Sequence, residues 1–243
     1  MRESLEWAGP MREIKFPQSE SKRRLLEAAE QLFAERGFEA VSVRDVTHQA
    51  KANVAAVNYH FGSREGLISL VVVRYVTPIN DERLLRLDAL EKKWPGKVVP
   101  VEELIDAFVR PLVGSVRKSE LSERLFCKLV ARVFSLQGEA LPPIVEEQMK
   151  GMVERFLKAF GRSLPGLAPE ELVWRFHFVV GAVIHLLLNQ EMLFRLSAGA
   201  SGNPGTDALV GRLIRFASAG LREGLEQEAA ASVKKGPQAM FDF

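Results

Sequence analysis

The chain of 243 residues is long enough for one large domain or two modest ones, and its 47% hydrophobic and 26% charged residues are typical of a soluble protein with a real core. A net charge of only +2 gives no overall positive field, so charge alone does not predict nucleic-acid binding. The single cysteine, Cys127, excludes an intramolecular disulfide bond and fits a reducing cytoplasm.

Residues 1–19 contain acidic side chains and no continuous apolar stretch, so we expect an irregular arm and not a signal peptide. The first helix is predicted from Ser21 to Arg36. Its apolar side chains recur at helical spacing, and Gly37 follows as a helix stop. This helix would form one wall of a small N-terminal domain that covers residues 20–66.

The segment 42–67, SVRDVTHQAKANVAAVNYHFGSREGL, carries most of the functional information. Ser42 opens a short amphipathic helix, and a break at Lys51-Ala52-Asn53 follows. Asn53 is well placed to cap a second helix, Val54 to Phe61, because its side-chain oxygen can accept a free amide hydrogen bond. Two short helices joined by a tight turn form a helix-turn-helix, in which the second helix enters the DNA major groove.

The remainder of the chain is predicted to be helical as well. Ser63 caps a long helix that begins at Arg64, and Pro78 is expected to kink or break it before helix resumes from Asn80 to Lys93. Prolines and glycines separate the later helices, which are predicted from Val101 onward and over Leu121–Leu136, Ile144–Leu164, Pro169–Leu196 and Asp207–Glu226. The prediction is an all-α fold, with a larger helical bundle over residues 67–228 and a tail over residues 229–243.

The most apolar stretch, Phe176 to Leu188, is too short for the ~20 residues that a membrane span needs, so we predict a buried core helix and no membrane contact. Two of the four histidines, His177 and His185, lie eight positions apart, which is too far for both to chelate one ion. No HExxH, CxxC or GxSxG motif is present. The sequence therefore predicts neither an enzyme nor a protein with a metal or other cofactor.

The segments LLEAAEQLFAERGFEAVSVRDVTHQA and NVAAVNYHFGSREGLI together resemble the DNA-binding domain of the TetR/AcrR family of bacterial transcriptional regulators. The resemblance runs from about Lys22 to about Leu70, with family-typical spacing between all parts. It departs from the family pattern at Lys51, where most members have a turn glycine that takes a positive φ cheaply. It also departs at Asn58-Tyr59, because many members carry their tyrosine one position earlier.

The resemblance implies a cytoplasmic protein that binds a double-stranded DNA operator. It maps phosphate-contacting positions onto Ser42, Arg44, Tyr59, His60 and Arg64. It maps the groove-facing part of the recognition helix onto Asn53, Val54, Ala55, Ala56 and Asn58. From the residues alone, the small apolar side chains of this helix fit either packed core or contacts with thymine methyl groups.

Aromatic and methionine side chains recur at helical spacing in the bundle, where core is the default interpretation. A wide bundle rich in such residues can also hold an apolar pocket. We expect a ligand-binding cavity for a lipophilic small molecule, for which the resemblance to fatty-acid-responsive regulators suggests a fatty acid or acyl thioester. Its predicted lining is Phe108, Phe126, Val130, Phe134, Met152, Phe156, His177 and Phe178.

The last two predicted helices carry small residues among large apolar ones, which permits close helix approach. Such a surface is either internal core or a dimer face. By resemblance these are the family's dimerisation helices, and the predicted interface of the homodimer is Val180, Ile184, Leu188, Leu213, Ala217, Gly220 and Gly224.

Together, these observations predict a dimeric, ligand-responsive transcriptional regulator, and more specifically a repressor that a lipophilic molecule releases from a palindromic operator. Two alternatives remain open from the sequence. One is an all-α small-molecule-binding protein or enzyme that retains the helix-turn-helix. The other is a constitutive regulator without an inducer.

Overall fold

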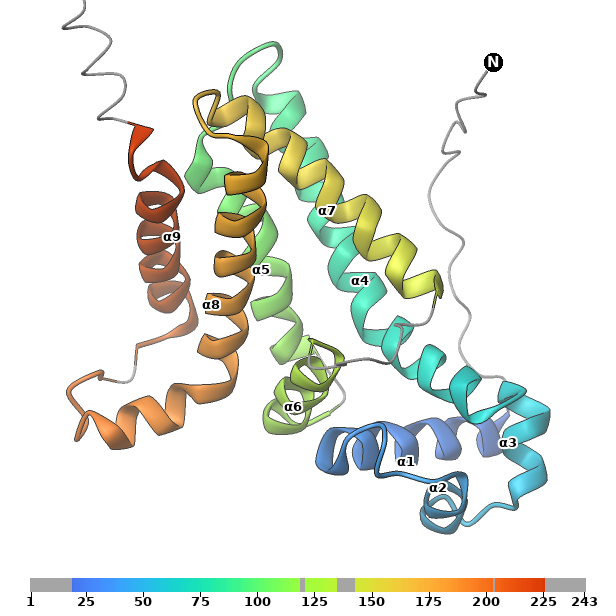
Figure 1. The fold of residues 1–243 in the computed structure, drawn as a ribbon. Helices are drawn as coiled ribbons and strands as arrows, with labels where there is room; N and C mark the ends of the chain where they lie inside the picture. The colour runs from blue at the N-terminus through green and yellow to red at the C-terminus, as the bar shows by residue number, and fades with distance from the viewer. Residues whose placement is uncertain (1–18, 119–120, 135–142, 203, 226–243) are drawn as a thin grey trace, which may run out of the picture.

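The computed structural model describes residues 19–118, 121–134, 143–202 and 204–225, so most of the predicted N-terminal arm and the whole predicted C-terminal tail lie outside the described residues. Every element in the described part is a helix, which confirms the all-α prediction (Figure 1). The helices are α1 (Glu20–Arg36), α2 (Val43–Gln49), α3 (Val54–Phe61), α4 (Arg64–Lys93), α5 (Val101–Lys118), α6 (Glu123–Phe134), α7 (Pro143–Ser163), α8 (Pro169–Leu196) and α9 (Thr206–Arg222).

The N-terminal core lies where α1, α2 and α3 meet the first turns of α4. Phe33, Val46 and Val57 are at most 1% exposed, because the apolar stripes of the three short helices converge on one another. Leu129 and Val133 of α6 belong to the same core. Helix α6 therefore packs directly on α1, although it lies far along the chain (Figure 1).

Helix α4 runs without interruption through Pro78, so of the predicted kink or break at this residue, the break is wrong. Proline removes one N–H from the helix ladder and crowds the preceding turn. Packing of α4 against α5 and α7 offsets that cost, and the neighbouring Thr77 hydroxyl donates a hydrogen bond of 2.8 Å to the Gln148 side chain of α7. As a result, one continuous helix links the N-terminal domain to the bundle.

The bundle core contains a cluster of phenylalanine rings from α5, α7 and α8. The ring centroid of Phe108 lies 5.3 Å from that of Phe156 and 4.8 Å from that of Phe176, and both pairs have the edge-on arrangement that aromatic rings favour. Phe160 joins the same cluster, 5.8 Å from Phe176. All four rings are at most 4% exposed and belong to one buried cluster, so they form the packed centre of the bundle.

Helix α8 is only partly buried, so the prediction of a buried core helix is wrong for one of its faces. Leu172, Phe176 and Val183 face the core, whereas Trp174 and Phe178 on the other side are 54% and 63% exposed. By length and composition α8 could cross a membrane, with a mean hydropathy of 1.6 over a window that is 22% buried. The same two properties also suit a helix that pairs with another protein surface.

Candidate nucleic-acid interface and bundle cavity

Helix α2 starts at a capping box formed by Ser42 and Asp45. The Asp45 amide donates to the Ser42 hydroxyl at 3.2 Å, and the Ser42 amide donates to the Asp45 carboxylate at 2.8 Å. Hydrogen bonds from Ser42 lower the pKa of Asp45 below its usual value. The hydroxyl of Ser42, which was predicted to contact phosphate, therefore also holds the start of α2.

The turn between α2 and α3 places Lys51 in the left-handed region, with φ of +50°. The Ala52 amide donates to the Thr47 carbonyl at 2.9 Å, and the Lys51 amide donates to the His48 carbonyl at 3.2 Å. These bonds close the turn tightly, which sets the angle between the two helices. The position thus has the conformation for which glycine is suited, although the chain carries lysine there.

Helix α3 turns one face to the core and the other to solvent. Val57 is fully buried, whereas Val54 is 44% and Tyr59 85% exposed. Asn53 caps the helix as predicted, because its side-chain oxygen accepts from the Ala56 amide at 2.8 Å. The remaining residues predicted to face the groove, Ala55, Ala56 and Asn58, are exposed or half-buried. His60, which was predicted to contact phosphate, is half-buried.

Arg64 lies in a different setting from the one predicted for a phosphate contact. Its Nε donates to the Val41 carbonyl at 3.1 Å, and its Nη2 donates to the Phe38 carbonyl. Its Nη1 lies 3.9 Å from the Glu65 carboxylate. The guanidinium therefore fastens the loop before α2 to the start of α4, whereas Arg44 on α2 is exposed.

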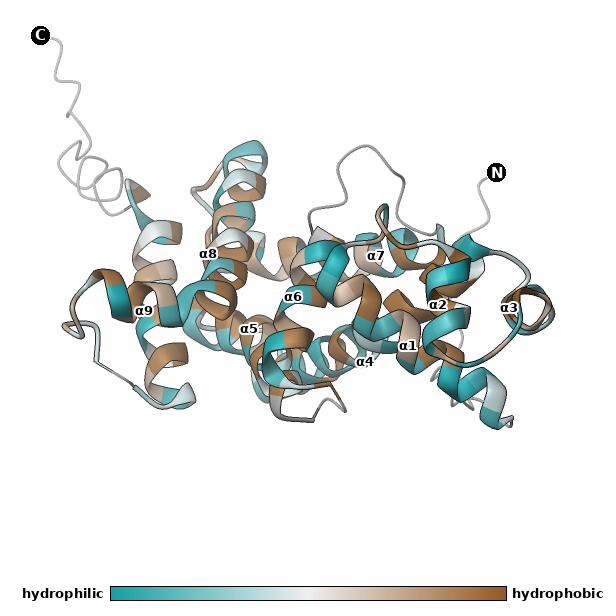
Figure 2. Ribbon diagram, turned by 90° about the horizontal axis from the view of Figure 1, so that it is seen from below, coloured by the Kyte–Doolittle hydropathy of each residue, from teal (hydrophilic) through white to brown (hydrophobic). Residues whose placement is uncertain are grey.

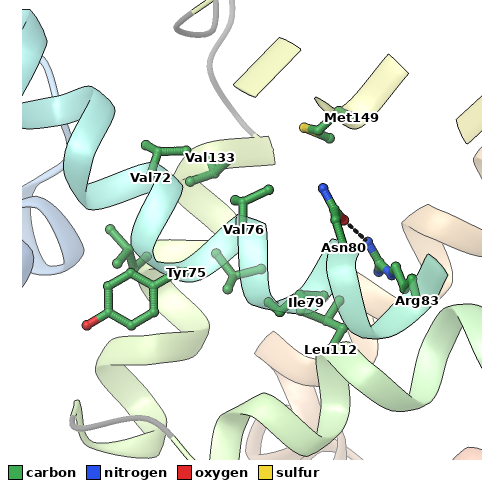
Figure 3. A pocket seen from close by; sticks show the side chains of 11 residues that line it. Val72, Tyr75, Val76, Ile79, Asn80, Arg83, Leu112, Val133 and Met149 are labelled. Carbon is green, nitrogen blue, oxygen red and sulfur yellow. Dashed lines mark hydrogen bonds between the residues drawn. The ribbon is translucent and has the colours of Figure 1, made fainter. Parts of the chain in front are cut away.

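A cavity of about 30 Å³ lies between α4, α5, α6 and α7 (Figure 3). Branched aliphatic side chains make most of its wall. Three polar side chains of α4 also reach it, Tyr75, Asn80 and Arg83. The sequence interpretation assigned none of these three residues to a ligand site, although they continue the inward stripe of Val72, Val76 and Ile79 at helical spacing.

Of the predicted ligand residues whose side chains the structure describes, only Val130 lines this cavity, so the predicted lining needs correction. Phe108 and Phe156 pack in the aromatic cluster, and Phe126 and Met152 are buried in the same core. His177 and Phe178 are exposed on α8 and do not face the cavity. The side chain of Phe134 lies outside the described residues. The physical reason is that rings of this size fill the core by packing on one another.

Tyr75 connects the cavity to the N-terminal domain. Its ring lines the cavity, and its hydroxyl donates to the Glu30 carboxylate of α1 at 2.9 Å. Figure 3 shows the hydroxyl pointing away from the other lining residues. Glu30 is 2% exposed and also accepts from Arg74 at 3.0 Å. Movement of the Tyr75 ring would therefore act on a buried polar contact of α1.

The predicted dimer residues divide into two groups. Leu213 and Ala217 are buried inside the protomer, at 8% and 4% exposure, which corrects their assignment as contacts with a partner. Val180 and Ile184 are half-buried, and Leu188 and Gly220 are exposed. Gly224 follows α9 with φ of +82°, so it is a turn glycine and not a helix-packing one.

The exposed apolar face of α8 and α9 is instead formed by larger residues that the predicted interface omitted. They are Val173, Trp174, Phe178 and Phe216, of which Phe216 is 73% exposed. Figure 2 shows α8 and α9 at the end of the molecule opposite α3, with apolar stretches on both helices. A sequence signal existed, because residues 174 and 178 are one helical turn apart.

Comparisons with known proteins match both parts of the chain. The family model described as "Bacterial regulatory proteins, tetR family" matches residues 25–71. The model described as "Tetracyclin repressor-like, C-terminal domain" matches residues 106–220. The first match contains the helix-turn-helix, and the second contains most of the bundle.

Two curated relatives are similar over part of their length. An HTH-type transcriptional repressor of Mycobacterium tuberculosis is 40% identical over 65 residues, 27% of this chain and 34% of the relative. The HTH-type transcriptional repressor NicS of Pseudomonas putida is 30% identical over 135 residues, 53% of this chain and 63% of the relative. The chain thus spans about a third of the first relative and less than two thirds of the second.

Solved structures share the fold. The hemolysin II transcriptional regulator HlyIIR has a TM-score of 0.54 at 16% identity, covering 81% of this chain and 96% of that one. A TetR-like regulator from Rhodococcus sp. RHA1 has a TM-score of 0.53 at 20% identity, covering 86% of this chain and 100% of that one. At these identities the likeness concerns the fold alone.

Proposed function

Because the chain belongs to the TetR/AcrR family of bacterial transcriptional regulators, we propose that it is a cytoplasmic, dimeric repressor that binds a palindromic operator and is controlled by a small molecule. The main observation behind the proposal is the solvent-exposed face of α3, on which Tyr59 is 85% exposed. Helix α3 is the second helix of a helix-turn-helix whose turn is closed by backbone hydrogen bonds. The names of the two curated relatives support repression.

The exposed face of α3 has the chemistry for major-groove contact. Asn58 carries an amide, which suits adenine edges, and Val54 and Ala55 offer small apolar contacts for thymine methyl groups. Arg44, Tyr59 and His60 flank this face and are suited to phosphate oxygens, which position a protein without specifying sequence. A two-fold dimer would place two such helices on half-sites about 10 bp, or a multiple of it, apart.

The exposed apolar face of α8 and α9 supports dimerisation. Trp174, Phe178 and Phe216 are each more than half exposed, and the rings of Trp174 and Phe178 lie 6.3 Å apart. A stable soluble monomer rarely leaves large apolar patches open to solvent. The partner we propose is a second copy, because an isologous contact would cover the same residues on both chains.

Small-molecule control is supported by the helices that connect the cavity to α1. Helices α4 and α6 both line the cavity and both pack on the N-terminal core. A ligand that changed their packing would change the position of α1, and through it α3, provided that it binds one arrangement better than the other. The cavity of about 30 Å³ is far below the ~300–1,000 Å³ of ligand pockets, so a long-chain fatty acid or acyl thioester needs a wider form of the bundle.

The test is selection of DNA from a random pool with the purified full-length protein, followed by titration of the enriched sequence. We expect an inverted repeat. Asn58→Ala should change the selected sequence, and Tyr59→Ala should weaken binding to all sequences. Leu85→Ala, at an exposed position of α4, is the matched control and should leave both unchanged. Absence of any enriched repeat, or an Asn58→Ala protein with the wild-type preference and affinity, would contradict the proposal.

A further inference from the structure

Arg83 carries a positive charge inside the bundle, at 4% exposure. Its Nε donates to the Phe108 carbonyl at 2.8 Å, and its guanidinium carbon lies 4.1 Å from the centre of the Phe108 ring. Within the described part of the chain, no carboxylate lies within ion-pair distance of it. Burial accordingly lowers the pKa of Arg83 to about 9, because no neighbouring negative charge offsets desolvation.

Asn80 lies one helical turn before Arg83 and is also 4% exposed. Its side-chain oxygen accepts from Arg83 Nη1 at 3.1 Å, which fixes the orientation of the amide. The amide nitrogen then has no hydrogen-bond partner among the described residues. Figure 3 shows this nitrogen directed away from Arg83, toward the part of the cavity where Met149 lies.

These two side chains supply donors and positive charge to the cavity, but no free acceptor. A water molecule could accept from the Asn80 amide, yet it would leave the charge of Arg83 uncompensated in an apolar setting, which is costly. A carboxylate satisfies both groups, since it accepts several hydrogen bonds and carries the opposite charge.

The rest of the wall restricts what can be attached to that carboxylate. Val72, Ile79, Leu112 and Val133 present only hydrocarbon, which suits an unsubstituted alkyl chain. The volume of about 30 Å³ favours a short chain, because a single water already needs about 10–15 Å³ measured in this way. Met149 is half-buried and unbranched, so its side chain can move aside for a few additional carbon atoms.

We propose that this cavity binds a short-chain aliphatic monocarboxylic acid, with Arg83 and Asn80 as the contacts of its carboxylate. Binding of the acid does not require DNA, whereas an effect of the acid on operator binding rests on the proposed function. An acid in the cavity would lie beside Tyr75, whose hydroxyl contacts Glu30 of α1.

Isothermal titration of the full-length, DNA-free protein tests the proposal, with butyrate and hexanoate as probes. Butyramide and hexanamide are the uncharged controls of the same shape. We expect each acid to bind about tenfold more tightly than its amide, or better. Arg83→Met should weaken acid binding by about tenfold or more, because it removes the charge at similar volume. Arg86→Met, three residues along and paired with Glu82, should bind as the wild type does.

If circular dichroism shows that Arg83→Met does not fold, the proposal is tested instead with Asn80→Leu and with the comparison of acids and amides in the wild type. The proposal is overturned if no acid binds at millimolar concentration, if amides bind as tightly as acids, or if a folded Arg83→Met keeps its affinity. Titration of the operator complex separates the two proposals. Acids that bind the free protein but leave operator affinity unchanged support this site and contradict small-molecule release.

Discussion

Lys51 occupies the tight turn of the helix-turn-helix with φ of +50°, where a side chain with a Cβ atom is unfavourable by about 1–2 kcal/mol. Glycine removes that strain but has more freedom in the unfolded chain. We therefore expect Lys51→Gly to raise the free energy of unfolding by about 0.5–1 kcal/mol in urea titrations. Lys51→Ala, which loses the same charge and keeps a Cβ, should show no such gain. Equal stabilities of the two variants would contradict the interpretation.

Replacing Arg64 with alanine should affect stability and replacing Arg44 should affect DNA binding, because Arg64 is hydrogen-bonded to backbone carbonyls and Arg44 is exposed. Arg64→Ala leaves the Val41 and Phe38 carbonyls without their donor, and we expect it to lower the free energy of unfolding by about 1–3 kcal/mol. Arg44→Ala should change stability by less than about 0.5 kcal/mol. It should weaken DNA binding at all sequences and reduce the slope of log affinity against log salt by about 1.

Urea unfolding and DNA titration at several salt concentrations distinguish the two arginines. An Arg64→Ala protein with wild-type stability would return this residue to the phosphate-contacting set. Sequence alone could not assign it, since its partners are backbone carbonyls of a loop, and any residue type supplies those. The cap at Asn53 was predictable, because an N-cap depends on residues within one helical turn.

At the scale of helices, an ion pair joins the start of α5 to the end of α9. Arg222 Nη2 lies 2.8 Å from the Glu102 carboxylate. Hydrogen bonds with Arg222 lower the pKa of Glu102 from 4.5 to about 2. A depressed carboxyl pKa contributes stability above the unfolded value, and that contribution is lost as pH falls toward the folded value. The pair should therefore stabilise the protein above about pH 4.5 and lose its effect between there and pH 2.

We expect Glu102→Gln to lower the free energy of unfolding at pH 7 by about 1 kcal/mol or less, because both side chains are more than a third exposed. The difference between variant and wild type should shrink as the pH is lowered from 5 to 3. Thermal unfolding at several pH values measures it. Glu103→Gln, at the neighbouring carboxylate that pairs with Lys93, is the control for loss of one charge. A difference that stays constant with pH would contradict the assignment.

Helix limits followed closely from the sequence where local signals define them. The predicted limits of Val54–Phe61 and Pro169–Leu196 agree with α3 and α8, since capping residues, prolines and glycines mark both ends. Two other features depend on tertiary packing. Helix α4 continues through Pro78 because α5 and α7 pack along it. Helix α8 itself carries apolar residues on all of its faces, so the sequence pattern alone could not indicate which face is exposed.

In the molecule as a whole, two cores meet along α4 and α6. Leu129 and Val133 of α6 belong to the N-terminal core, and Val130, between them in sequence, belongs to the bundle core and lines the cavity. The sequence predicted both parts of the molecule, but not this connection or the site at Asn80 and Arg83. Such contacts join residues distant in the chain, and periodicity within one helix carries no information on its neighbours.

The whole-molecule prediction concerns assembly through the exposed apolar face of α8 and α9. Phe178 and Phe216 are 63% and 73% exposed in the protomer, so replacing either with glutamate removes no core packing. We expect Phe178→Glu and Phe216→Glu to convert a dimer into folded monomers, because a buried unpaired charge in the interface is unfavourable by several kcal/mol. Leu85→Glu, at a position 67% exposed on α4, should remain dimeric.

Substitutions at Gly220 and Gly224 distinguish an effect on dimerisation from an effect on the stability of the protomer. A Cβ at Gly220 would meet nothing within 4 Å in the protomer, so Gly220→Leu should leave the fold intact and disturb only contacts with a partner. Gly224 has φ of +82°, so Gly224→Leu should lower the stability of the protomer itself. Sedimentation velocity at micromolar concentration measures assembly, and thermal unfolding measures stability. Monomers should also lose operator affinity, because one half-site offers only part of the contact energy. A wild-type protein that sediments as a monomer would exclude this face as a dimer interface.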